Sequence, residues 1–420
     1  MSQDQASRPA ARPHDLVVSG ASYSGLALAL ALVGALPGIR IAVVDPQEPQ
    51  GAGRPPRDPR AFALSASSRH LLEAIGIWPA VSAEAEPVLD INITDSELGA
   101  GIRPTLLTYT NETGEGEAAS HILPGGALLA ALVDKARATA GIEFITPYSA
   151  ATGYRTTDVG AHVALADGRE IAGRLVVAAE GRRSSLREAA GIKLVGWPYH
   201  QTGIVVTVAH ERPHMGRAVQ HFLPAGPFAI LPLPGNRSCI TWSEEAREAR
   251  RILALDDEAL LGEVEKRFGG QLGAVTLAGR PASWPLEMHL ARAYVAPRLA
   301  LVGDTAHGVH PIAGQGLNLA LRDVAALAEV VAETMRVGLD PGSPDVLQRY
   351  ERWRRFDSTV SALAFDSINR LFSNDSTLLR AARDFGLGVV DQLPFLKRML
   401  VTEAAGLTGE LPRLLKGEMP

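Results

Sequence analysis

The sequence predicts an α/β fold that begins with a strand–helix–strand unit, contains a β-rich insertion and ends in a helical region. Residues 14–45 pass from a short apolar strand through a glycine turn and an Ala/Leu-rich helix to a second apolar strand, which is the order of a βαβ unit. Strand-like runs then crowd residues 191–285, and helical spacing occupies residues 345–420. At 420 residues, the chain is long enough for more than one domain.

The composition excludes several classes of protein. Hydrophobic residues make up 46% and charged residues 21% of the chain, as in folded, water-soluble proteins. The 41 basic and 46 acidic side chains leave a net charge of -5, so we expect no nucleic-acid partner. The single cysteine, Cys239, excludes an internal disulfide and a cysteine metal cage. Residues 1–13 lack the apolar core of a signal peptide, so we expect a disordered arm and a cytoplasmic protein.

The first candidate site is the turn that joins the N-terminal strand to its helix. This turn runs from Gly20 to Gly25, and Asp45 follows the second strand. A glycine turn, a free helix N-terminus and an acid after the next strand are the parts that bind the pyrophosphate and ribose of a dinucleotide. Ser22 stands where such turns usually have their middle glycine. The residues favour a nucleotide site, with a plain close-packed strand–helix turn as the alternative.

The second candidate site follows a strand expected at residues 175–179. Glu180 and Gly181 end that strand, and a basic turn leads through Ser184 to Arg187 in a short helix. An acid and a small residue at the carboxyl end of a strand are typical of a ligand crevice in an open α/β sheet. Ser184 is placed to cap the helix. A capped helix with a solvated arginine cluster is the alternative interpretation.

The third candidate site is the most specific of the three. An apolar strand leads to Gly303 and Asp304, and Pro311 fixes the turn that follows. Gly314 and Gly316 leave the backbone bare at the start of a long Ala/Leu-rich helix. Such a helix start stabilises negative charge that develops on a ring system stacked before it.

Two histidines in the same stretch, His307 and His310, raise the question of a metal site. A protein metal site needs at least three ligands, and the sequence offers no third candidate nearby. We therefore expect no bound metal and assign both histidines to the turn. His210, His214 and His221 are expected to be exposed or structural, with contact between one of them and a substrate as the alternative.

Taken together, these residues resemble those of a known family. Residues 303–323, the turn Glu180–Arg187 and the segment Asp58–Trp78 are similar to the FAD-dependent aromatic hydroxylases, the flavoprotein monooxygenases related to p-hydroxybenzoate hydroxylase. Within them they are most similar to the ubiquinone-biosynthesis hydroxylase group, and the likeness extends from Asp15 to about Leu411. The resemblance implies a Rossmann-like FAD-binding domain with an inserted β-rich substrate domain and a C-terminal helical region.

The resemblance also implies roles for individual residues. Those expected to bind the cofactor are Gly20, Ser22, Gly25, Asp45, Arg60, Glu180, Gly181, Arg187, Gly303, Asp304 and Asn318. Those expected to face the isoalloxazine and act in catalysis are Pro311, Gly314, Gln315 and Gly316. Within the first set, Asp45 would hold the ADP half of FAD, Asp304 the ribityl hydroxyls, and Arg60 the flavin or pyrophosphate. Two departures from the family pattern, Ser22 for glycine and Glu180 for aspartate, bear on FAD affinity and on use of the electron donor.

The positions of the motifs predict how the chain divides into domains. Glu180 and Asp304 must meet one cofactor although they lie far apart in the sequence, so the β-rich stretch between them is an insertion whose junction is the natural place for substrate. The expected parts are a disordered arm at 1–13, a discontinuous FAD-binding domain at 14–80, 120–190 and 286–345, a β-rich substrate domain at 81–119 and 191–285, and a C-terminal helical region at 346–420.

The activity implied by the resemblance is hydroxylation of the aromatic ring of a polyprenylated phenol or quinone precursor in ubiquinone biosynthesis. NAD(P)H or a protein reductase would reduce FAD, and O₂ would then form a flavin hydroperoxide that attacks the ring. Only one dinucleotide-type glycine turn is evident, so the donor would bind transiently or be another protein. The alternatives are a non-catalytic flavoprotein or scaffold of the quinone-biosynthesis machinery, and a flavoenzyme that reduces isoprenoid double bonds.

The C-terminal region carries several apolar segments between residues 378 and 415. We hypothesise that they line a lipid-side entrance or rest on the inner face of the membrane, where other quinone-biosynthesis proteins would be partners. An ordinary helical cover on the core is the alternative. The basic aromatic run at residues 352–356 is interpreted as a helix with a solvated face.

Overall fold

The computed structural model describes residues 13–53, 58–95, 105–114, 116–311, 314–372 and 401–420. The predictions for the N-terminal arm and for most of the apolar C-terminal segments concern residues 1–12 and 373–400, which lie outside the described residues. The same holds for positions 312 and 313, between Pro311 and Gly314.

The N-terminal βαβ unit forms the centre of a mainly parallel sheet. Strand β1 pairs in parallel with β2 on one side and with β11 on the other, with Val18 opposite both Val43 and Val177. Strand β19 adds a further parallel neighbour to β11. Within the described residues this sheet has eight strands: β18 (Val295–Ala296), β19 (Leu299–Leu301), β11 (Glu170–Ala178), β1 (His14–Ser19), β2 (Ile41–Val44), β8 (Ile142–Phe144), β10 (Ala161–Leu165) and β9 (Ala151–Thr156).

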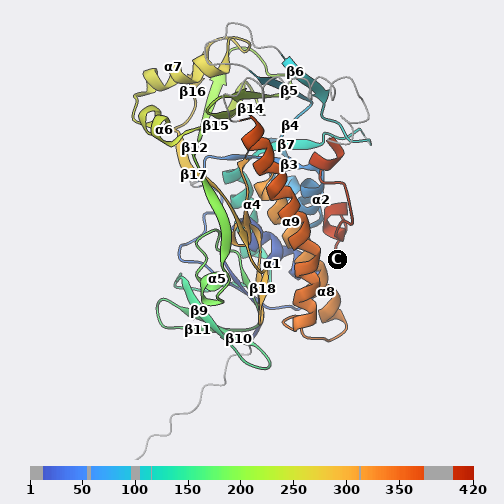
Figure 1. Ribbon diagram of the computed structural model, residues 1–420. Helices are drawn as coiled ribbons and strands as arrows, with labels where there is room; N and C mark the ends of the chain where they lie inside the picture. The colour runs from blue at the N-terminus through green and yellow to red at the C-terminus, as the bar shows by residue number, and fades with distance from the viewer. Residues whose placement is uncertain (1–12, 54–57, 96–104, 115, 312–313, 373–400) are drawn as a thin grey trace, which may run out of the picture.

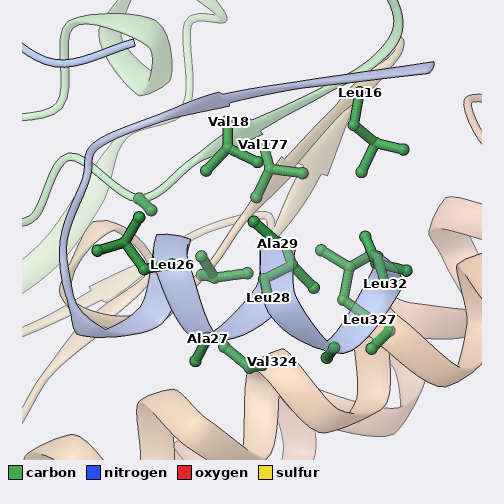
Figure 2. Packing of buried hydrophobic residues seen from close by; sticks show 14 of the residues in the cluster. Leu16, Val18, Leu26, Ala27, Leu28, Ala29, Leu32, Val177, Val324 and Leu327 are labelled. Carbon is green, nitrogen blue, oxygen red and sulfur yellow. The ribbon is translucent and has the colours of Figure 1, made fainter. Parts of the chain in front are cut away.

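Helix α1 (Tyr23–Ala35) is buried on nearly all sides because it lies between this sheet and another helix. Figure 2 shows Val18 and Val177 of the sheet above it and Val324 and Leu327 of α8 (Gly316–Arg336) below it. An apolar helix without a polar face is expected in such a position. Helix α4 (Gly125–Ala138) packs beside α1, and the short helix α5 (Ser185–Ala189) packs on β9. The strand ends that carry the glycine turns are therefore attached to a rigid core.

The β-rich insertion is a second, mostly antiparallel sheet, which forms the other lobe of the molecule in Figure 1. Its outer face is covered by two helices, α6 (Ala246–Leu253) and α7 (Asp257–Phe268). Within the described residues its nine strands are β20 (His307–Gly308), β17 (Ala282–Ala291), β12 (Leu194–His210), β15 (Arg237–Glu245), β14 (Gly226–Leu233), β13 (Arg217–Leu223), β5 (Asp90–Asp95), β6 (Thr105–Thr110) and β16 (Val275–Leu277).

A small third sheet lies between the two larger ones. It contains β3 (Ala61–Ser65), β7 (Ser120–Pro124) and β4 (Glu86–Pro87). Ala61 and Ala63 of β3 pack against Val205 and Cys239 of the second sheet. The short elements α2 (Ala66–Ala74), α3 (Trp78–Val81) and η1 (Ser82–Glu84) continue from β3. Strand β3 thus contacts the face of the second sheet that lies opposite α6 and α7.

The long helix α9 (Pro344–Phe372) runs past both large sheets (Figure 1). It packs on α8 and touches β14, β17, β18 and β20. Beyond it, Val401 and Ala405 pack against Ala66 at the start of α2, and η4 (Arg413–Lys416) lies on α2 and α8. The C-terminal region therefore returns to the core formed by α2 and α8.

The positions of the strands can be compared with the expected domain limits. Strands β5, β6 and β12 to β16 lie in the second sheet, as expected of segments 81–119 and 191–285. The limit expected between residues 285 and 286 falls inside β17, which pairs with β12 of the second sheet from Ala282 to Ala291. The domain boundaries themselves stay predictions.

Candidate functional site

The first glycine turn lies directly on the end of strand β11. Gly20 has φ +111°, and a Cβ there would stand 2.3 Å from the carbonyl oxygen of Ala179. No residue with a side chain has room in this position. The turn predicted from the first motif therefore touches the residue that immediately precedes Glu180.

Ser22 and Gly25 place the start of helix α1. A Cβ on Gly25 would lie 2.1 Å from the carbonyl oxygen of Gly20. The helix can therefore pack this close to the turn only because residue 25 is glycine. Ser22 is the N-cap: its Oγ accepts from the N–H of Gly25 at 3.5 Å and donates to the carbonyl of Ala179 at 3.2 Å. The serine that departs from the family pattern is thus a helix cap that binds the neighbouring turn.

Asp45 follows β2 and faces the same turn. Its Oδ2 accepts from the N–H of Ala21 at 2.8 Å, and its Oδ1 accepts from the N–H of Gln47 at 2.9 Å. The carboxylate is therefore held beside the N-terminus of α1. This is the position from which an acid reaches the ribose of a bound dinucleotide.

Glu180 does not point freely into a crevice, because four protein donors surround its carboxylate. Oε1 accepts from the hydroxyls of Ser19 at 2.7 Å and Ser185 at 3.2 Å. Oε2 accepts from the hydroxyl of Ser184 at 2.5 Å and the N–H of Leu186 at 3.1 Å. Glu180 is therefore a structural acceptor that joins the end of β1 to the start of α5.

Arg187 connects the second motif to the third. It is buried, and its Nη1 donates to the carbonyl oxygens of Arg182 at 2.6 Å and Thr305 at 3.4 Å. Burial lowers the pKa of the guanidinium below its usual value. Arg182 forms an ion pair with Glu287 of β17. The alternative of a solvated arginine cluster is therefore wrong for Arg187 and incomplete for Arg182.

Gly181 has φ +74°, and a Cβ added to it would have no heavy atom within 4 Å. Glycine is therefore needed at this position for the backbone conformation alone.

The turn after β19 meets the first turn and presents an exposed carboxylate. Gly303 has φ +61°, and a Cβ there would lie 2.8 Å from the Oγ of Ser24 in α1. The side chain of Asp304 is exposed, and its carboxylate has no hydrogen bond or ion pair within the part of the chain that the structure describes. Its main-chain carbonyl accepts from Nε2 of His289 at 2.9 Å. Asp304 is thus fixed by its backbone and has its carboxylate available for a ligand.

Asn318 ties the start of α8 to strand β3. Its Nδ2 donates to the carbonyl of Ala63 at 2.9 Å and to Oε1 of Gln315 at 3.2 Å, while its Oδ1 accepts from the N–H of Ser65 at 3.0 Å. Gly314, with φ +62°, lies against Ala63 as well. Asn318 is buried and uses both of its amide N–H donors within the protein, so its position is that of a support for the turn.

The start of α8 is open where the sequence predicts a bare backbone. A Cβ added to Gly316 would have no heavy atom within 4 Å. Pro311 and Gln315 flank this opening and are half-buried, and the N–H of Gly314 donates to the carbonyl of Pro311 at 3.0 Å. A 21-residue helix that starts at an open backbone can stabilise negative charge there.

Arg60 belongs to a cluster that the sequence did not indicate. It pairs with Asp58 at 2.6 Å, and the hydroxyl of Tyr23 donates to the same carboxylate at 2.9 Å. The guanidinium lies over the rings of Phe62 and Trp284, 5.1 and 5.7 Å from their centroids. Burial would lower the pKa of Arg60, but Asp58 outweighs it and raises that pKa. The arginine stays charged at the edge of β3, between the two large sheets.

A buried ion pair supports the third turn from behind. Asp323 of α8 accepts from the N–H of Gly303 at 3.0 Å, from Nε of Arg354 at 2.8 Å, and contacts Nε2 of His307 at 2.6 Å. Arg354 also donates to Asp357 at 2.5 Å. The interpretation of residues 352–356 as a solvated face is therefore wrong for Arg354, which α9 turns inward. In the sequence, the one signal for this structural role of Asp323 is that the residue lies at the end of the third motif.

The histidines singled out in the sequence hold structural positions. His307 pairs with Asp323, and His310 is buried with its ring edge-on to Tyr199 at 4.9 Å. Burial lowers the pKa of His310 to about 4, so the ring is neutral. The remaining three, His210, His214 and His221, are buried and hydrogen-bonded to main-chain or side-chain partners. Across the described ranges, no group of three His, Cys, Asp or Glu side chains could hold a metal ion.

A cavity bordered by the second sheet lies near these turns but is not lined by their glycines. It has a volume of about 660 Å³ and is bordered by the β12 bulge, the β13–β14 turn, the start of α6 and Asn369 of α9. Tyr199 lines this cavity and contacts the third motif through His310. The position of this cavity therefore does not identify the candidate site. The contacts between the glycine turns are the stronger indication.

The three motifs meet at the carboxyl ends of parallel strands. Gly20 touches Ala179, Arg187 reaches Thr305, and Gly303 packs on Ser24. Two positive-φ glycines, a capped helix start, the free carboxylate of Asp304 and the open backbone at Gly316 lie around this meeting point. These features suit a long ligand that has a pyrophosphate, a polyol and a flat ring, as FAD has.

Comparison with known proteins agrees with this geometry. The chain matches the family described as FAD binding domain over residues 14–359. It belongs to that FAD binding domain family. Membership explains why the glycine turns converge, and it confirms FAD as the cofactor expected from the sequence.

Relatives of this FAD binding domain protein include named hydroxylases. It is 41% identical over 406 residues to the ubiquinone hydroxylase UbiL of Rhodospirillum rubrum, covering 96% of this chain and 92% of that protein. It is 33% identical over 405 residues to the 3-demethoxyubiquinol 3-hydroxylase of Escherichia coli, covering 94% and 99%. The fold is similar to that of p-nitrophenol 4-monooxygenase PnpA from Pseudomonas putida, with TM-score 0.74, 18% identity and coverage of 94% and 98%. The expected fold class and the class of FAD-dependent monooxygenase are confirmed.

Proposed function

We propose that this flavoprotein hydroxylates the aromatic ring of a hydrophobic, polyprenylated phenol in ubiquinone biosynthesis. The observation that carries the proposal is that three glycine turns lie in contact with one another, in a chain 41% identical to a ubiquinone hydroxylase. A second relative named for a ubiquinol hydroxylation supports the same substrate class. The β-rich sheet beside this position supplies the wall against which such a ring would lie.

The residues of the first and third turns would divide the cofactor between them. Gly20, Ser22 and Gly25 would leave the N-terminus of α1 open to the pyrophosphate, and Asp45 would accept from the ribose hydroxyls. Asp304 would accept from the ribityl hydroxyls, because its carboxylate is exposed on a fixed backbone.

The turn at the start of α8 would contact the reactive part of the cofactor. Gly316 and its neighbour Gln315 would offer backbone N–H groups to the isoalloxazine, and Pro311 with Gly314 would shape the turn. FAD, once bound and reduced, supplies together with O₂ the oxygen atom that enters the ring. The protein's part is to hold the ring, exclude water and stabilise charge at the α8 N-terminus.

The residues of the second motif would act mainly by holding the neighbouring turns in position. Arg187 and Glu180 join strands, turns and α5 by hydrogen bonds, and Arg60 would lie beside the cofactor with its charge partly neutralised by Asp58. Such contacts hold the cofactor turns in place. The electron donor, NAD(P)H or a protein reductase, would approach from the exposed side of these turns.

The substitution Asp304→Ala tests the proposal most directly. Hydrogen bonds to a charged group contribute about 1.5–3 kcal/mol, so we expect FAD affinity to fall roughly tenfold to a hundredfold while the thermal midpoint of the apoprotein is unchanged. Asp257→Ala in the exposed first turn of α7 is the matched control. FAD binding is read by flavin fluorescence, and hydroxylation by mass spectrometry of quinone intermediates in hydroxylase-deficient strains blocked at different ring positions. Wild-type protein that inserts no oxygen into any intermediate would overturn the proposal.

We also propose peripheral contact with a membrane of anionic lipids. No helix among the residues described is long and apolar enough to cross a bilayer. Phe356, Val360 and Leu363 are exposed on one face of α9, at 78%, 50% and 47%, and Arg352 and Arg355 are exposed beside them. An apolar stripe with flanking cations suits a lipid surface. Flotation with anionic liposomes should weaken in a Phe356→Ser, Val360→Ser double variant; unchanged flotation would contradict the idea.

A further inference from the structure

The cavity of about 660 Å³ lies where the bulge of β12 packs beside the start of α6. Strand β12 contributes Trp197 and Tyr199 to its lining, and α6 contributes Arg247 and Arg250. A volume of this size is usual for small-molecule and cofactor sites. None of the glycines of the three turns is among the residues that line it, so the proposed FAD site does not explain this cavity.

Hydrogen bonds hold the walls of the cavity in a fixed shape. Nε1 of Trp197 donates to Oδ1 of Asp366 in α9 at 3.1 Å. Nε2 of Gln201 donates to the carbonyl of Ala225 at 2.7 Å, and its Oε1 accepts from Nδ2 of Asn369 at 3.4 Å. Strand β12, the β13–β14 turn and α9 are thus joined around the cavity, which has the pre-formed character of a binding site.

The backbone of β12 is irregular where it lines the cavity. The pairing of β12 with β17 shifts register between Pro198 and Thr202. Within this bulge His200 has φ +58°, a conformation that residues with a side chain rarely adopt. Bulges and strained residues are common beside ligand sites, so the backbone gives independent support to the cavity as a site.

Two arginines of the cavity lack an acidic partner. Arg247 and Arg250 lie one turn apart on the same side of α6, and both are exposed. Neither forms an ion pair or a side-chain hydrogen bond in the part of the chain that the structure describes. Arg251, which does not line the cavity, pairs with Glu248 at 2.6 Å and with Glu263 at 3.0 Å. The acids near α6 therefore leave the two cavity arginines free for an anionic ligand.

The lining suits a ligand that combines flat rings with phosphate groups. Trp197 and Tyr199 offer aromatic rings for stacking. The guanidinium groups of Arg247 and Arg250 are suited to phosphates, which they bind through pairs of N–H donors. Glu245 is the one acid among the described residues that line the cavity, so the arginines outnumber it. A dinucleotide, with two flat rings joined by a pyrophosphate, matches both features.

The cavity also lies beside the third motif. The ring of Tyr199 is edge-on to that of His310, with 4.9 Å between the ring centroids. His310 directly precedes Pro311, which flanks the open start of α8. A dinucleotide in the cavity would therefore be bound next to the turn that is proposed to contact the flavin.

We propose that this cavity binds the nicotinamide dinucleotide that reduces the flavin, with its phosphates on Arg247 and Arg250 and a ring against Trp197 and Tyr199. The inference rests on the proposed function and names its electron donor, in place of a protein reductase. In the reduction, the C4–H bond of the dihydronicotinamide breaks, its hydride carries two electrons to N5 of FAD, and the donor leaves as the oxidised nicotinamide. Tyr199 stands between the cavity and His310, so its ring would turn aside for the nicotinamide to reach the flavin.

Binding of NADP⁺ tests the inference without turnover. The FAD-loaded protein is titrated with NADP⁺ in a calorimeter. We expect Arg247→Gln and Arg250→Gln each to weaken binding roughly tenfold, because each removes charge-assisted hydrogen bonds to phosphate. Arg280→Gln makes the same exchange at an exposed position outside the cavity and should bind NADP⁺ as the wild type does.

Reduction of the flavin gives a second measurement, by anaerobic stopped-flow absorbance. The Arg247→Gln and Arg250→Gln variants should need about tenfold more NADPH for half the limiting rate, as expected from weaker binding. Dithionite, which needs no binding site, should reduce the wild type and all variants alike. FAD content and thermal midpoint verify that each variant is folded.

The outcomes separate this inference from the proposed function. Wild-type affinity for NADP⁺ in the Arg247→Gln, Arg250→Gln double variant would overturn the inference. So would a wild-type protein that a protein reductase reduces and NADPH does not, and the proposed hydroxylation would then still stand. Flavin reduction by NADPH without insertion of oxygen into any phenol would instead overturn the proposed function and leave the dinucleotide site standing.

Discussion

Asp323 of α8 and Arg354 of α9 form an ion pair inside the protein, with Nε and Oδ1 2.8 Å apart and both side chains at most 5% exposed. The same carboxylate accepts the N–H of Gly303 at 3.0 Å. The backbone that presents Asp304 is thus held from behind by a charge pair between two helices. The contact therefore links the stability of the fold to the position of Asp304.

Breaking this pair should destabilise the protein strongly. Asp323→Asn removes the fully buried carboxylate that pairs with Arg354 and leaves the guanidinium with Asp357 as its remaining counter-charge; breaking a buried pair costs about 3–5 kcal/mol. Urea denaturation monitored by circular dichroism measures the loss. The Asp323→Asn, Arg354→Met double variant should lose less stability than Asp323→Asn alone. The control Glu170→Gln, in the exposed pair with Arg155, should leave the urea midpoint unchanged. Equal losses in the single and double variants would show that the pair is not the cause.

The same pair predicts how stability depends on acid. Burial would raise the pKa of Asp323, but His307 and Arg354 outweigh it and hold the pKa below its usual value. A carboxyl with a lowered pKa in the folded state contributes stability that is present above its unfolded pKa, near 4, and is lost as the pH falls through the folded value. The urea midpoints of wild type and Asp323→Asn should therefore converge below about pH 4. A constant difference down to pH 2 would contradict this assignment.

Ser22 can be tested as a helix cap rather than as a defect in the glycine motif. Ser22→Ala removes the acceptor for the N–H of Gly25 and should cost about 1 kcal/mol, whereas Ser22→Gly should cost only a few tenths. Because glycine restores the family pattern, FAD affinity should be kept or increased in Ser22→Gly. Thermal midpoints measure the change in stability, and flavin fluorescence titrations measure the change in FAD affinity. Weaker FAD binding in the glycine variant would show that the hydroxyl itself contacts the cofactor.

Gly316 and Gly20 should respond in opposite ways to an added methyl group. Gly20→Ala should destabilise the fold by roughly 3 kcal/mol or more, because φ is positive and the Cβ would collide with the carbonyl of Ala179. Gly316→Ala has free space and should keep its thermal midpoint, yet bind FAD more weakly, because the methyl would stand before the open backbone. Unchanged FAD affinity in Gly316→Ala would argue against contact between this turn and the isoalloxazine.

Glu180→Asp separates the structural role of this acid from any effect on the electron donor. The shorter side chain cannot keep all four of its donors, and each lost hydrogen bond should cost about 1 kcal/mol. Because aspartate is the family residue, donor-driven reduction of the flavin should be preserved or faster. Stopped-flow absorbance and thermal melting measure the two effects. Slower flavin reduction would contradict the expected effect on the donor, and an unchanged melting midpoint would contradict the structural role of Glu180.

Much of the flavin side could be predicted because its signals are local. The strand–helix order and the glycines at 20, 25, 303 and 314 reflect short stretches in which neighbouring residues determine the backbone. The motif spacing also led to the expectation that distant turns share one ligand, and the turns do lie in contact with one another. The hydrogen-bond saturation of Glu180 was not predictable, because Ser19 lies 161 residues away from it in the sequence.

By itself, the sequence determined the α/β class, the three glycine turns and the family, since glycine conformation and strand–helix order depend on adjacent residues. Only the tertiary structure decided that Arg354 turns inward to Asp323 and that Arg60 is paired with Asp58 over Trp284. These facts depend on the register between strands and on which helix faces are covered. Long-range packing determines both, and no short stretch of sequence contains them.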